Sequence, residues 1–327
     1  MTDEMFTATI LVLLLIMDEK FSKIIVIVGP TASGKTELGI WLAKKFNGEI
    51  ISADSRQIYR QMTIGTAKPP GSWRKIDGES VYMVEGVPHF GLDILDPKDE
   101  FSLADWQELC AVWIKQILKR NHLPIVVGGT GLYLWSIIDN LSIPPVAPNK
   151  KLRRSLSAKP LSELTILLRE IDPETMKKID LRNPRRVLRA LEVAILTGQS
   201  FFEQRHKSPP LYSILQLGVN YSREELYARI DSRVDEQIKD GLVTETESLM
   251  KKKYPWNLPS MSSLGYRQIG EYLRGETPLA EAVVKLKQAT RHYARRQLTW
   301  FKRDKRIIWL NGPDKAAAEK LVKEFLK

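Results

Sequence analysis

The sequence has very few of the residues that build disulfides and zinc sites. Cys110 is the single cysteine among 327 residues, which excludes a disulfide within one chain and any cysteine-based zinc site. The four histidines, at positions 89, 122, 206 and 292, show no metal-ligand spacing. We therefore expect no zinc, and a reducing, cytoplasmic setting fits this composition best.

Long hydrophobic runs are also missing. The apolar run 8–16 is far too short to span a bilayer, which takes about 20 residues. Asp3 and Glu4 precede it where a signal peptide carries basic residues, and no small-residue cleavage site follows. We expect no membrane association. Residues 1–20 are interpreted as a probably disordered N-terminal extension outside the fold, with Met17 resembling a native start.

The positive charge is distributed unevenly along the chain. Residues 1–140 hold 14 Lys/Arg against 17 Asp/Glu, whereas the rest hold 36 against 22, and the total is +11. A basic second part of this kind favours a polyanionic partner. A basic surface that only aids solubility is the alternative, and charge alone does not decide between the two.

The first part of the chain alternates between strand and helix patterns. Lys23–Val28 is a continuous apolar, β-branched run, typical of a buried parallel strand, and 49–52 and 124–127 resemble it. Helical patterns cover about 36–46 and, opened by a capping box of Ser102 and Asp105, about 102–120. This alternation predicts an α/β fold with a parallel sheet flanked by helices.

The character of the sequence changes at about residue 141. A proline-rich hinge (141–148) leads into helical patterns without strands. Leu215–Val219 is strand-like, Ser222 with Glu225 opens another helix, and Arg306–Leu310 is a possible last strand. The predicted organisation is an α/β core interrupted by an all-helical insertion. The expected boundaries are 21–140 and 208–327 for the core and 141–207 for the insertion.

Residues 29–36 (GPTASGKT) match the phosphate-loop pattern G-x-x-x-x-G-K-[ST] and lie between a predicted strand and a predicted helix. In such a loop, backbone N–H groups surround phosphate oxygens, the lysine adds charge and the hydroxyl can ligate Mg²⁺. The pattern predicts a bound phosphate or diphosphate with magnesium, and it does not say whether the molecule is ATP. The expected binding residues are Gly29, Pro30, Thr31, Ala32, Ser33, Gly34, Lys35 and Thr36.

Asp54 follows the second predicted strand, at the sheet edge where open α/β sheets bind their ligands. A carboxylate facing the phosphate loop can accept a proton from an attacking nucleophile. A magnesium-shell or turn-capping aspartate is the alternative. Small-acceptor kinases place an acid similarly, so Asp54 alone does not separate the enzyme classes.

Several longer motifs carry a family resemblance. Together they resemble the tRNA dimethylallyltransferase (tRNA isopentenyltransferase) family over almost all of the chain from about 23 to 310. The motifs are GPTASGKT (29–36), ISADSRQIYRQMTIGTAKP (51–69), PHFGLD (88–93), VVGGTGLY (126–133), NPRRVLRALEV (183–193), SSLGYRQI (262–269) and ATRHYARRQLTWFKR (289–303).

The resemblance implies a substrate and a set of roles. In the family the loop holds the diphosphate of dimethylallyl diphosphate, and the acceptor is the exocyclic amine of the flipped adenine immediately 3′ of the anticodon. By motif position Asp54 is the expected general base, while Lys35, Thr36 and Mg²⁺ hold the diphosphate. Thr130 is expected to contact the base or tRNA, at an entrance lined by Ser55, Arg56 and Gln57. No obligatory protein partner is expected, and the chain is expected to be monomeric.

The pair Arg229 and Arg233 follows the family pattern R-I-x-x-R. At a spacing of four on a helix they repel each other by roughly 0.2–0.5 kcal/mol unless an anion lies between them. We expect Arg233 to be catalytic and leave Arg229 undecided. The alternative is two intrahelical pairs, Glu225 with Arg229 and Glu236 with Arg233.

Basic residues of the second part are the expected tRNA contacts. Asn183 and Pro184 are typical of a helix N-cap and first position, and the arginines that follow oppose the helix dipole, which a phosphate partner would relieve. Basic residues of 285–306 are interleaved with aromatics, as suits single-stranded RNA. Solvated helix faces and, for Tyr266, ordinary packing are the alternatives. The expected contacts are Arg153, Arg185, Arg186, Arg189, Gly265, Tyr266 and Arg267.

Three other functions stay open on the sequence alone. An adenylate isopentenyltransferase would use the same core with a free nucleotide as acceptor, but would need neither the insertion nor the basic second part. A phosphate-loop kinase would use Asp54 toward a hydroxyl, leaving GGTGLY unexplained. An RNA-binding protein with a decayed site conflicts with the intact Gly34, Lys35, Thr36 and Asp54.

Overall fold

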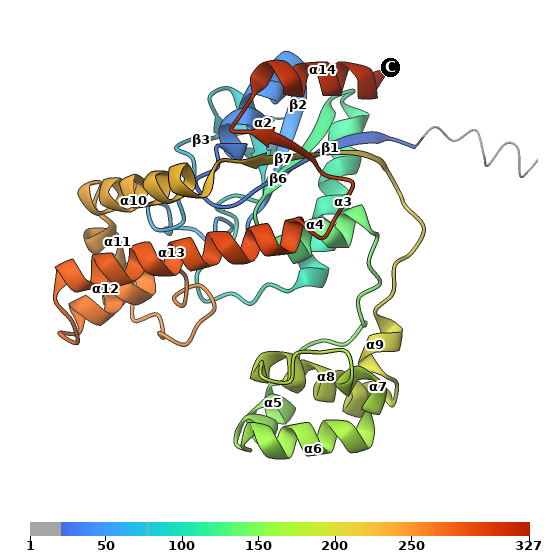
Figure 1. Ribbon diagram of the computed structural model, residues 1–327, viewed down its shortest axis with the longest axis vertical. Coiled ribbons are helices and arrows are strands. Elements are labelled where there is room, and N and C mark those ends of the chain that lie inside the picture. Colours follow the sequence, from blue (N-terminus) through green and yellow to red (C-terminus); the bar gives the residue numbers. More distant parts are fainter. Residues whose placement is uncertain (1–20, 77) are drawn as a thin grey trace, which may run out of the picture. The chain divides into compact units, whose positions relative to one another are not determined.

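The computed structural model describes residues 21–76 and 78–327, so the prediction made for residues 1–20 lies outside the described residues. The chain divides into two compact units (Figure 1). One, called the core here, comprises the residues up to Leu134 together with Leu211–Lys327, and the other, called the inserted unit, is Trp135–Pro210. The roles assigned to these two parts from the sequence stay predictions.

An eight-stranded sheet forms the centre of the core, in the order β3-β4-β5-β2-β6-β1-β7-β8. Neighbours from β5 to β8 are parallel, whereas the β3–β4 and β4–β5 pairs are antiparallel. The predicted α/β class is confirmed, but the sheet is mixed rather than wholly parallel. The strands are β1 Lys23–Val28, β2 Gly48–Ala53, β3 Ser72–Ile76, β4 Glu79–Val84, β5 Val87–Phe90, β6 Leu123–Gly128, β7 Ser213–Asn220 and β8 Ile308–Asn311.

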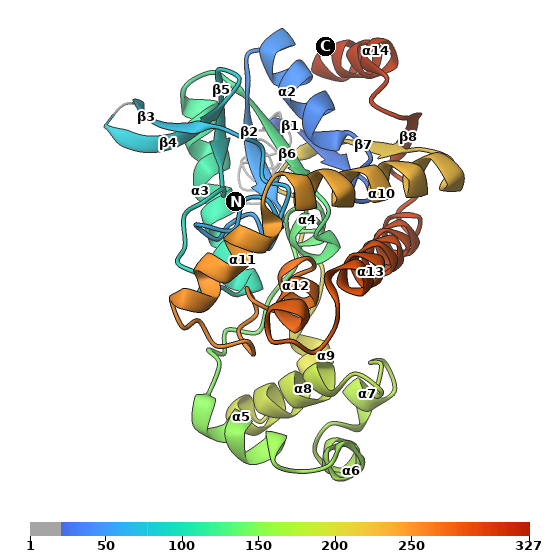
Figure 2. The same cartoon turned by 90° about the vertical axis from the view of Figure 1, so that its left-hand side faces the viewer.

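Helices cover the sheet and extend beyond it (Figure 2). The two predicted capping boxes are present, at Ser102 with Asp105 and at Ser222 with Glu225, and each satisfies two end groups of its helix. The helices are α2 Lys35–Lys45, α3 Leu103–Lys119, α4 Gly131–Ile138, α10 Arg223–Lys239, α11 Leu242–Lys251, α12 Tyr266–Leu273, α13 Leu279–Phe301 and α14 Lys315–Leu326.

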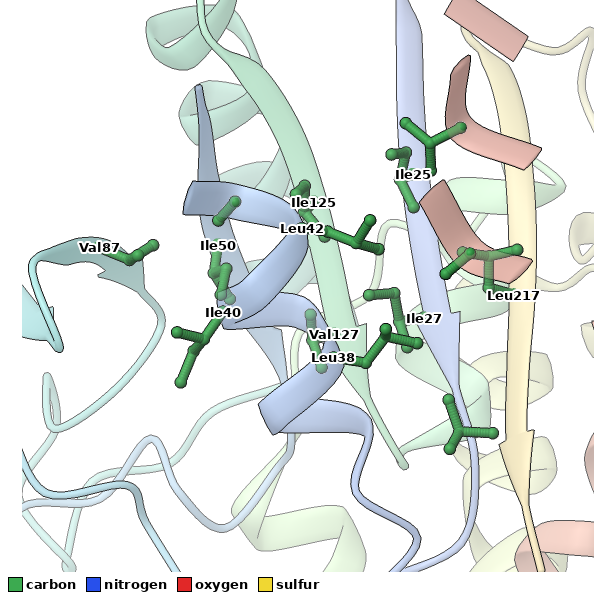
Figure 3. Packing of buried hydrophobic residues seen from close by; sticks show 14 of the residues in the cluster. Ile25, Ile27, Leu38, Ile40, Leu42, Ile50, Val87, Ile125, Val127 and Leu217 are labelled. Carbon is green, nitrogen blue, oxygen red and sulfur yellow. The ribbon is translucent and has the colours of Figure 1, made fainter. Parts of the chain in front are cut away.

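The packing of α2 on the sheet holds the phosphate loop in place. Leu38 and Leu42 of α2 are buried against strand residues such as Ile27 and Val127 (Figure 3), and α14 contributes Ala318 and Val322 to the same cluster. Burying one such side chain stabilises the fold by roughly 1.5–3 kcal/mol. Because β1 and α2 are both fixed in this way, the loop joining them has little freedom.

The inserted unit has its own hydrophobic core. Leu156, Leu164, Leu168, Val187 and Leu191 are buried together. As predicted, Asn183 caps a helix whose first residue is Pro184. The described residues 135–210 form no β-strand, as the sequence pattern predicted. The helices are α5 Lys150–Ser157, α6 Leu161–Ile171, α7 Pro173–Met176, α8 Pro184–Thr197 and α9 Phe201–Gln204.

Candidate active site

The phosphate loop runs from the end of β1 to the start of α2. A Cβ on Gly29 would collide with the carbonyl oxygen of Val219 in β7, so only glycine lets the loop lie this close to the sheet. Gly34 has a positive φ of 88° and begins α2, whose N-terminal N–H groups favour an anion. Ser33 is fully buried, and its hydroxyl has no hydrogen-bond partner among the described residues. The loop therefore presents unused donors.

Positive charge gathers around this loop. The Lys35 ammonium donates to the Pro30 carbonyl at 3.0 Å. Burial lowers the pKa of Lys35 to about 8, with Asp54 opposing the shift and Arg233 adding to it. Burial, and then Arg229, likewise lower the pKa of Arg233. These three cations are close enough to destabilise one another, which is the electrostatic environment of an anion site.

The alternative pairing of the two arginines is not formed in the described structure. Glu225 accepts from the Ser222 N–H at 3.2 Å as part of the capping box, and Glu236 accepts from the Ser232 hydroxyl at 3.0 Å. Arg229 instead donates to the Ala32 carbonyl at 2.9 Å, and its guanidinium lies 4.6 Å from the Tyr221 ring centre. Arg229 thus turns toward the phosphate loop, and Arg233 is close enough to Lys35 to affect its pKa. The catalytic role of Arg233 stays a prediction.

Asp54 lies just beyond the carboxyl end of β2, as expected. Its Oδ1 accepts the N–H groups of Arg56 at 2.9 Å and Gln57 at 3.4 Å, so the residue does cap a turn. Its second carboxylate oxygen makes no hydrogen bond to any residue of 21–76 and 78–327. One oxygen fixes the orientation of the side chain, which leaves the other free to accept a proton.

The structure brings Asp54–Gln57 and Thr130 together. The Ser55 N–H donates to the Thr130 hydroxyl at 3.1 Å. The Gln57 amide donates to the carbonyls of Thr66 and Ala67, at 3.1 Å each, and Arg56 donates to the carbonyl of Pro259 at 2.5 Å. These contacts hold the four residues after β2 in one arrangement beside the phosphate loop.

One site residue escaped the sequence analysis. Gln297 of α13 accepts the Thr31 N–H at 2.9 Å and donates to the Gly129 carbonyl at 2.9 Å, so it joins the phosphate loop to the turn after β6. It lies within the motif 289–303, whose basic and aromatic residues carried the prediction of RNA contact. The motif itself was the available signal.

The segment Gly265–Arg267 shows three different environments. Gly265 has a positive φ of 90° before α12. Tyr266 is 0% exposed and donates to Glu245 at 2.6 Å, so its ring packs inside the core. Arg267 keeps 70% of its side chain exposed. Of the predicted tRNA contacts in this segment, Arg267 has the surface position that such a contact needs.

The four arginines of the inserted unit that were predicted to contact tRNA fall into two pairs. Arg153 makes two hydrogen bonds of 2.8 Å to the fully buried Glu192, and Arg189 donates to the same carboxylate at 2.6 Å. Burial alone would raise the pKa of Glu192, but hydrogen bonds from these arginines and the Asn149 N–H outweigh it and lower the pKa. Arg185 and Arg186 are exposed on the first turn of α8.

Within 21–76 and 78–327, no group of three or more His, Cys, Asp or Glu side chains is arranged to hold a metal ion. Over the same residues, every helix is too short or too polar to cross a membrane.

Fold and site together define a phosphate-loop α/β protein, in which a cluster of cations and an oriented carboxylate meet at the carboxyl edge of a sheet. The chain belongs to the IPP transferase family, whose model matches residues 57–304. The resemblance noted in the sequence is thereby confirmed. The family match leaves out the phosphate loop and Asp54, so the placement of these residues rests on the geometry above.

Curated relatives and solved structures agree with this assignment. A tRNA dimethylallyltransferase of Acetivibrio thermocellus is 43% identical over 92% of this chain and 96% of its own, and one of Pelotomaculum thermopropionicum is 42% identical over 95% and 97%. The tRNA isopentenylpyrophosphate transferase of Bacillus halodurans is 37% identical with a TM-score of 0.66, covering 93% and 95%. A eukaryotic dimethylallyltransferase solved acting on tRNA is 27% identical with a TM-score of 0.76, covering 93% and 77%.

Proposed function

We propose that this chain transfers the dimethylallyl group of dimethylallyl diphosphate to the exocyclic amine of the adenine immediately 3′ of the anticodon in tRNA, releasing diphosphate. The observation that carries this proposal is the group of cations around the phosphate loop, which faces Asp54 across the sheet edge. The relatives named as tRNA dimethylallyltransferases support the substrate pair.

The diphosphate is proposed to bind in the loop 29–36. Its developing negative charge, as the allylic C–O bond breaks, is stabilised by Lys35, Arg233 and the loop N–H groups. The Thr36 hydroxyl makes no hydrogen bond to a described residue, so it fits a Mg²⁺ that completes its coordination with diphosphate oxygens and water. Such an ion would supply further charge neutralisation for the leaving group.

Asp54 is proposed as the general base. An adenine amine is a weak nucleophile because its lone pair is delocalised into the ring, so removal of its proton assists formation of the new N–C bond. The free oxygen of Asp54 is the acceptor for that proton. A stacked adenine cannot reach a buried allylic carbon, so the base must be flipped, toward Ser55, Gln57 and Thr130.

The tRNA is proposed to contact exposed arginines of both units. Arg185, Arg186 and Arg267 have side chains that can reach phosphates, whereas Arg153 and Arg189 would contribute through Glu192 and the local fold. We propose a monomer acting in the cytoplasm. A free nucleotide as acceptor is less consistent with the chain, because such a substrate needs neither the inserted unit nor the basic second part.

The decisive assay is transfer of radiolabelled dimethylallyl diphosphate, with Mg²⁺, to unmodified tRNA, to AMP, or to buffer alone. Label at the adenine next to the anticodon is the expected result. Label in AMP alone would replace the proposal with an adenylate isopentenyltransferase. ATP hydrolysis without any prenyl transfer would replace it with a kinase.

Asp54→Asn tests the proposed base within the same assay. The asparagine keeps an oxygen for the two turn hydrogen bonds but cannot take up the proton. We expect turnover to fall about 10²–10⁴-fold while the Kd for tRNA, measured by filter binding, changes little. A parallel loss of tRNA binding would mean that Asp54 acts mainly by holding the turn.

A further inference from the structure

The helix α13 contacts the catalytic segments of the core in several places. Its buried Ala294 packs with Ala32 of the phosphate loop and with Ile230 of α10. A Cβ on Gly131, just after the turn that follows β6, would collide with the ring of Trp300. Between these two contacts, Gln297 is only 6% exposed and reaches both loops.

The hydrogen bonds of Gln297 define its orientation uniquely. Its Oε1 faces a backbone N–H, that of Thr31, and its Nε2 faces a backbone carbonyl, that of Gly129. Rotating the amide by 180° would set donor against donor and acceptor against acceptor. A Cβ on Gly129 would collide with Nε2, so the amide and the turn fit closely together. A primary amide of this length is what the gap accommodates.

The helix that carries Gln297 is itself fastened to the helix that carries Arg233. Arg291 of α13 donates to both carboxylate oxygens of Asp231 in α10, and Lys287 pairs with Asp235 at 2.7 Å. These ion pairs and the packing of α13 on α10 place the backbone of Gln297. The hydrogen bonds to the two loops then orient its amide.

We propose that Gln297 is a positioning residue that fixes the phosphate loop relative to the turn at 129–130, which follows β6. This inference rests on the proposed function. The loop holds the diphosphate end of one substrate, whereas the turn carries Thr130, which contacts the Asp54–Gln57 segment at the base side. One side chain thereby sets the separation between the allylic carbon and the attacking amine. Misplacement by about 1 Å is enough to lower a rate about 10²-fold.

The test compares Gln297→Met with Gln288→Met, an exposed glutamine of the same helix. Methionine has nearly the same length and volume as glutamine but makes neither hydrogen bond. We expect Gln297→Met to lower the single-turnover transfer rate about 10²-fold. The Kd values for magnesium diphosphate and for tRNA, measured without turnover, should each change by less than about fivefold. Gln288→Met should match the wild-type protein in every measurement.

Amide hydrogen exchange gives a readout that does not depend on activity. The Thr31 N–H should exchange faster in Gln297→Met, and amides of the sheet should exchange at their wild-type rates. Gln297→Asn is the second variant, because it keeps the amide but is one methylene too short to span both loops. It should also lower the transfer rate. If Gln297→Met does not fold, Gln297→Asn tests the inference by itself.

Two results would overturn the inference. One is a wild-type transfer rate in Gln297→Met, and the other is a loss explained entirely by weaker binding of diphosphate or by a smaller folded fraction. Failure of the proposed function is distinguishable from both, because the wild-type protein and Gln288→Met would then also fail to transfer label to tRNA.

Discussion

The two units treat their partly buried arginines in opposite ways. In the core, Arg233 has no carboxylate within 4.0 Å among the described residues, and the attraction of Glu236 does not outweigh burial and the repulsion from Arg229, which lower its pKa. In the inserted unit, Arg153 and Arg189 converge on Glu192 and neutralise it. Both regions are rich in arginine, and the sequence alone does not distinguish them.

This comparison distinguishes two uses of positive charge. In the core the charge is suited to bind an anionic ligand, whereas in the inserted unit it stabilises the fold. A buried cation without a partner destabilises the folded chain, and such an arrangement persists where a bound anion relieves it. A buried carboxylate that is paired with two arginines is already satisfied. Removing one member of such a group destabilises the fold, because it leaves a charge without a partner. The experiments below test this contrast, beginning with the largest expected effect.

Lys35→Met should have the largest effect. Without the ammonium, the charge on the departing diphosphate loses a principal stabilising group, and we expect transfer to fall at least about 10³-fold. Stability should move the other way, because burial of the ammonium costs more than its attraction to Asp54 offsets, and methionine removes that charge. The ligand-free Tm, measured by calorimetry at pH 7, should therefore rise by a few degrees.

Lys44→Met provides the matched control on the same helix. Lys44 is paired with Glu85 at the surface, with 47% of its side chain exposed. Its substitution should leave both transfer and Tm nearly unchanged. A fall in Tm on substituting Lys35 would contradict the idea that its charge is unsatisfied before the ligand binds.

Glu192→Ala should act on stability instead of on chemistry. Its loss would leave Arg153 and Arg189 without their common partner. Breaking a fully buried pair typically costs about 3–5 kcal/mol, and the cost here is smaller because the two arginine side chains keep 39% and 26% of their area exposed. We expect the inserted unit to unfold at lower denaturant concentration, followed by circular dichroism in urea. Glu170→Ala, at an exposed position of α6, should change the midpoint by very little. Equal midpoints for the two variants would remove Glu192 from the fold-stabilising role.

Arg185→Ala combined with Arg186→Ala should act on tRNA affinity. Both side chains are exposed, so we expect little change in Tm. If each contacts one phosphate, the slope of log K against log salt should flatten by about 0.7–0.9 per arginine, with weaker binding at low salt. Lys159→Ala with Arg169→Ala removes the same charge from another part of the unit. An identical salt slope in both double variants would mean that the contact is not specific to α8.

The sequence predicted those parts of the molecule that are encoded locally. The phosphate loop, the capping boxes at Ser102 and Ser222 and the cap at Asn183 each depend on residues within a few positions of one another. Five of the eight strands were located, each to within about two residues at either end. Four of them carry apolar runs that are buried on both faces, whereas β8 is largely exposed and was located from its apolar run alone.

What the sequence did not predict depends on contacts between distant segments. The strands β3 and β4 pair with each other at the edge of the sheet, and β3 is largely exposed, so it carries little of the apolar pattern that marks a buried strand. Gln297 acts on residues 266 positions away in the chain. The buried Tyr266 donates to Glu245, and the same carboxylate accepts three N–H groups of the loop Thr63–Gly65. No local rule identifies such partners.

The lowered Lys35 pKa of about 8 has two consequences that a pH series separates, one for ligand affinity and one for stability. Above pH 8 the ligand-free lysine loses its proton, so the affinity for magnesium diphosphate should fall by up to tenfold per pH unit. Between about pH 8 and the ordinary value of 10.5, the unfolded chain binds this proton and the folded chain does not. Stability relative to Lys35→Met should therefore rise with pH while affinity falls. Calorimetric titrations and urea midpoints from pH 7 to 9.5 would measure both, and an affinity profile in Lys35→Met as steep as in the wild-type protein would assign the titration to another group.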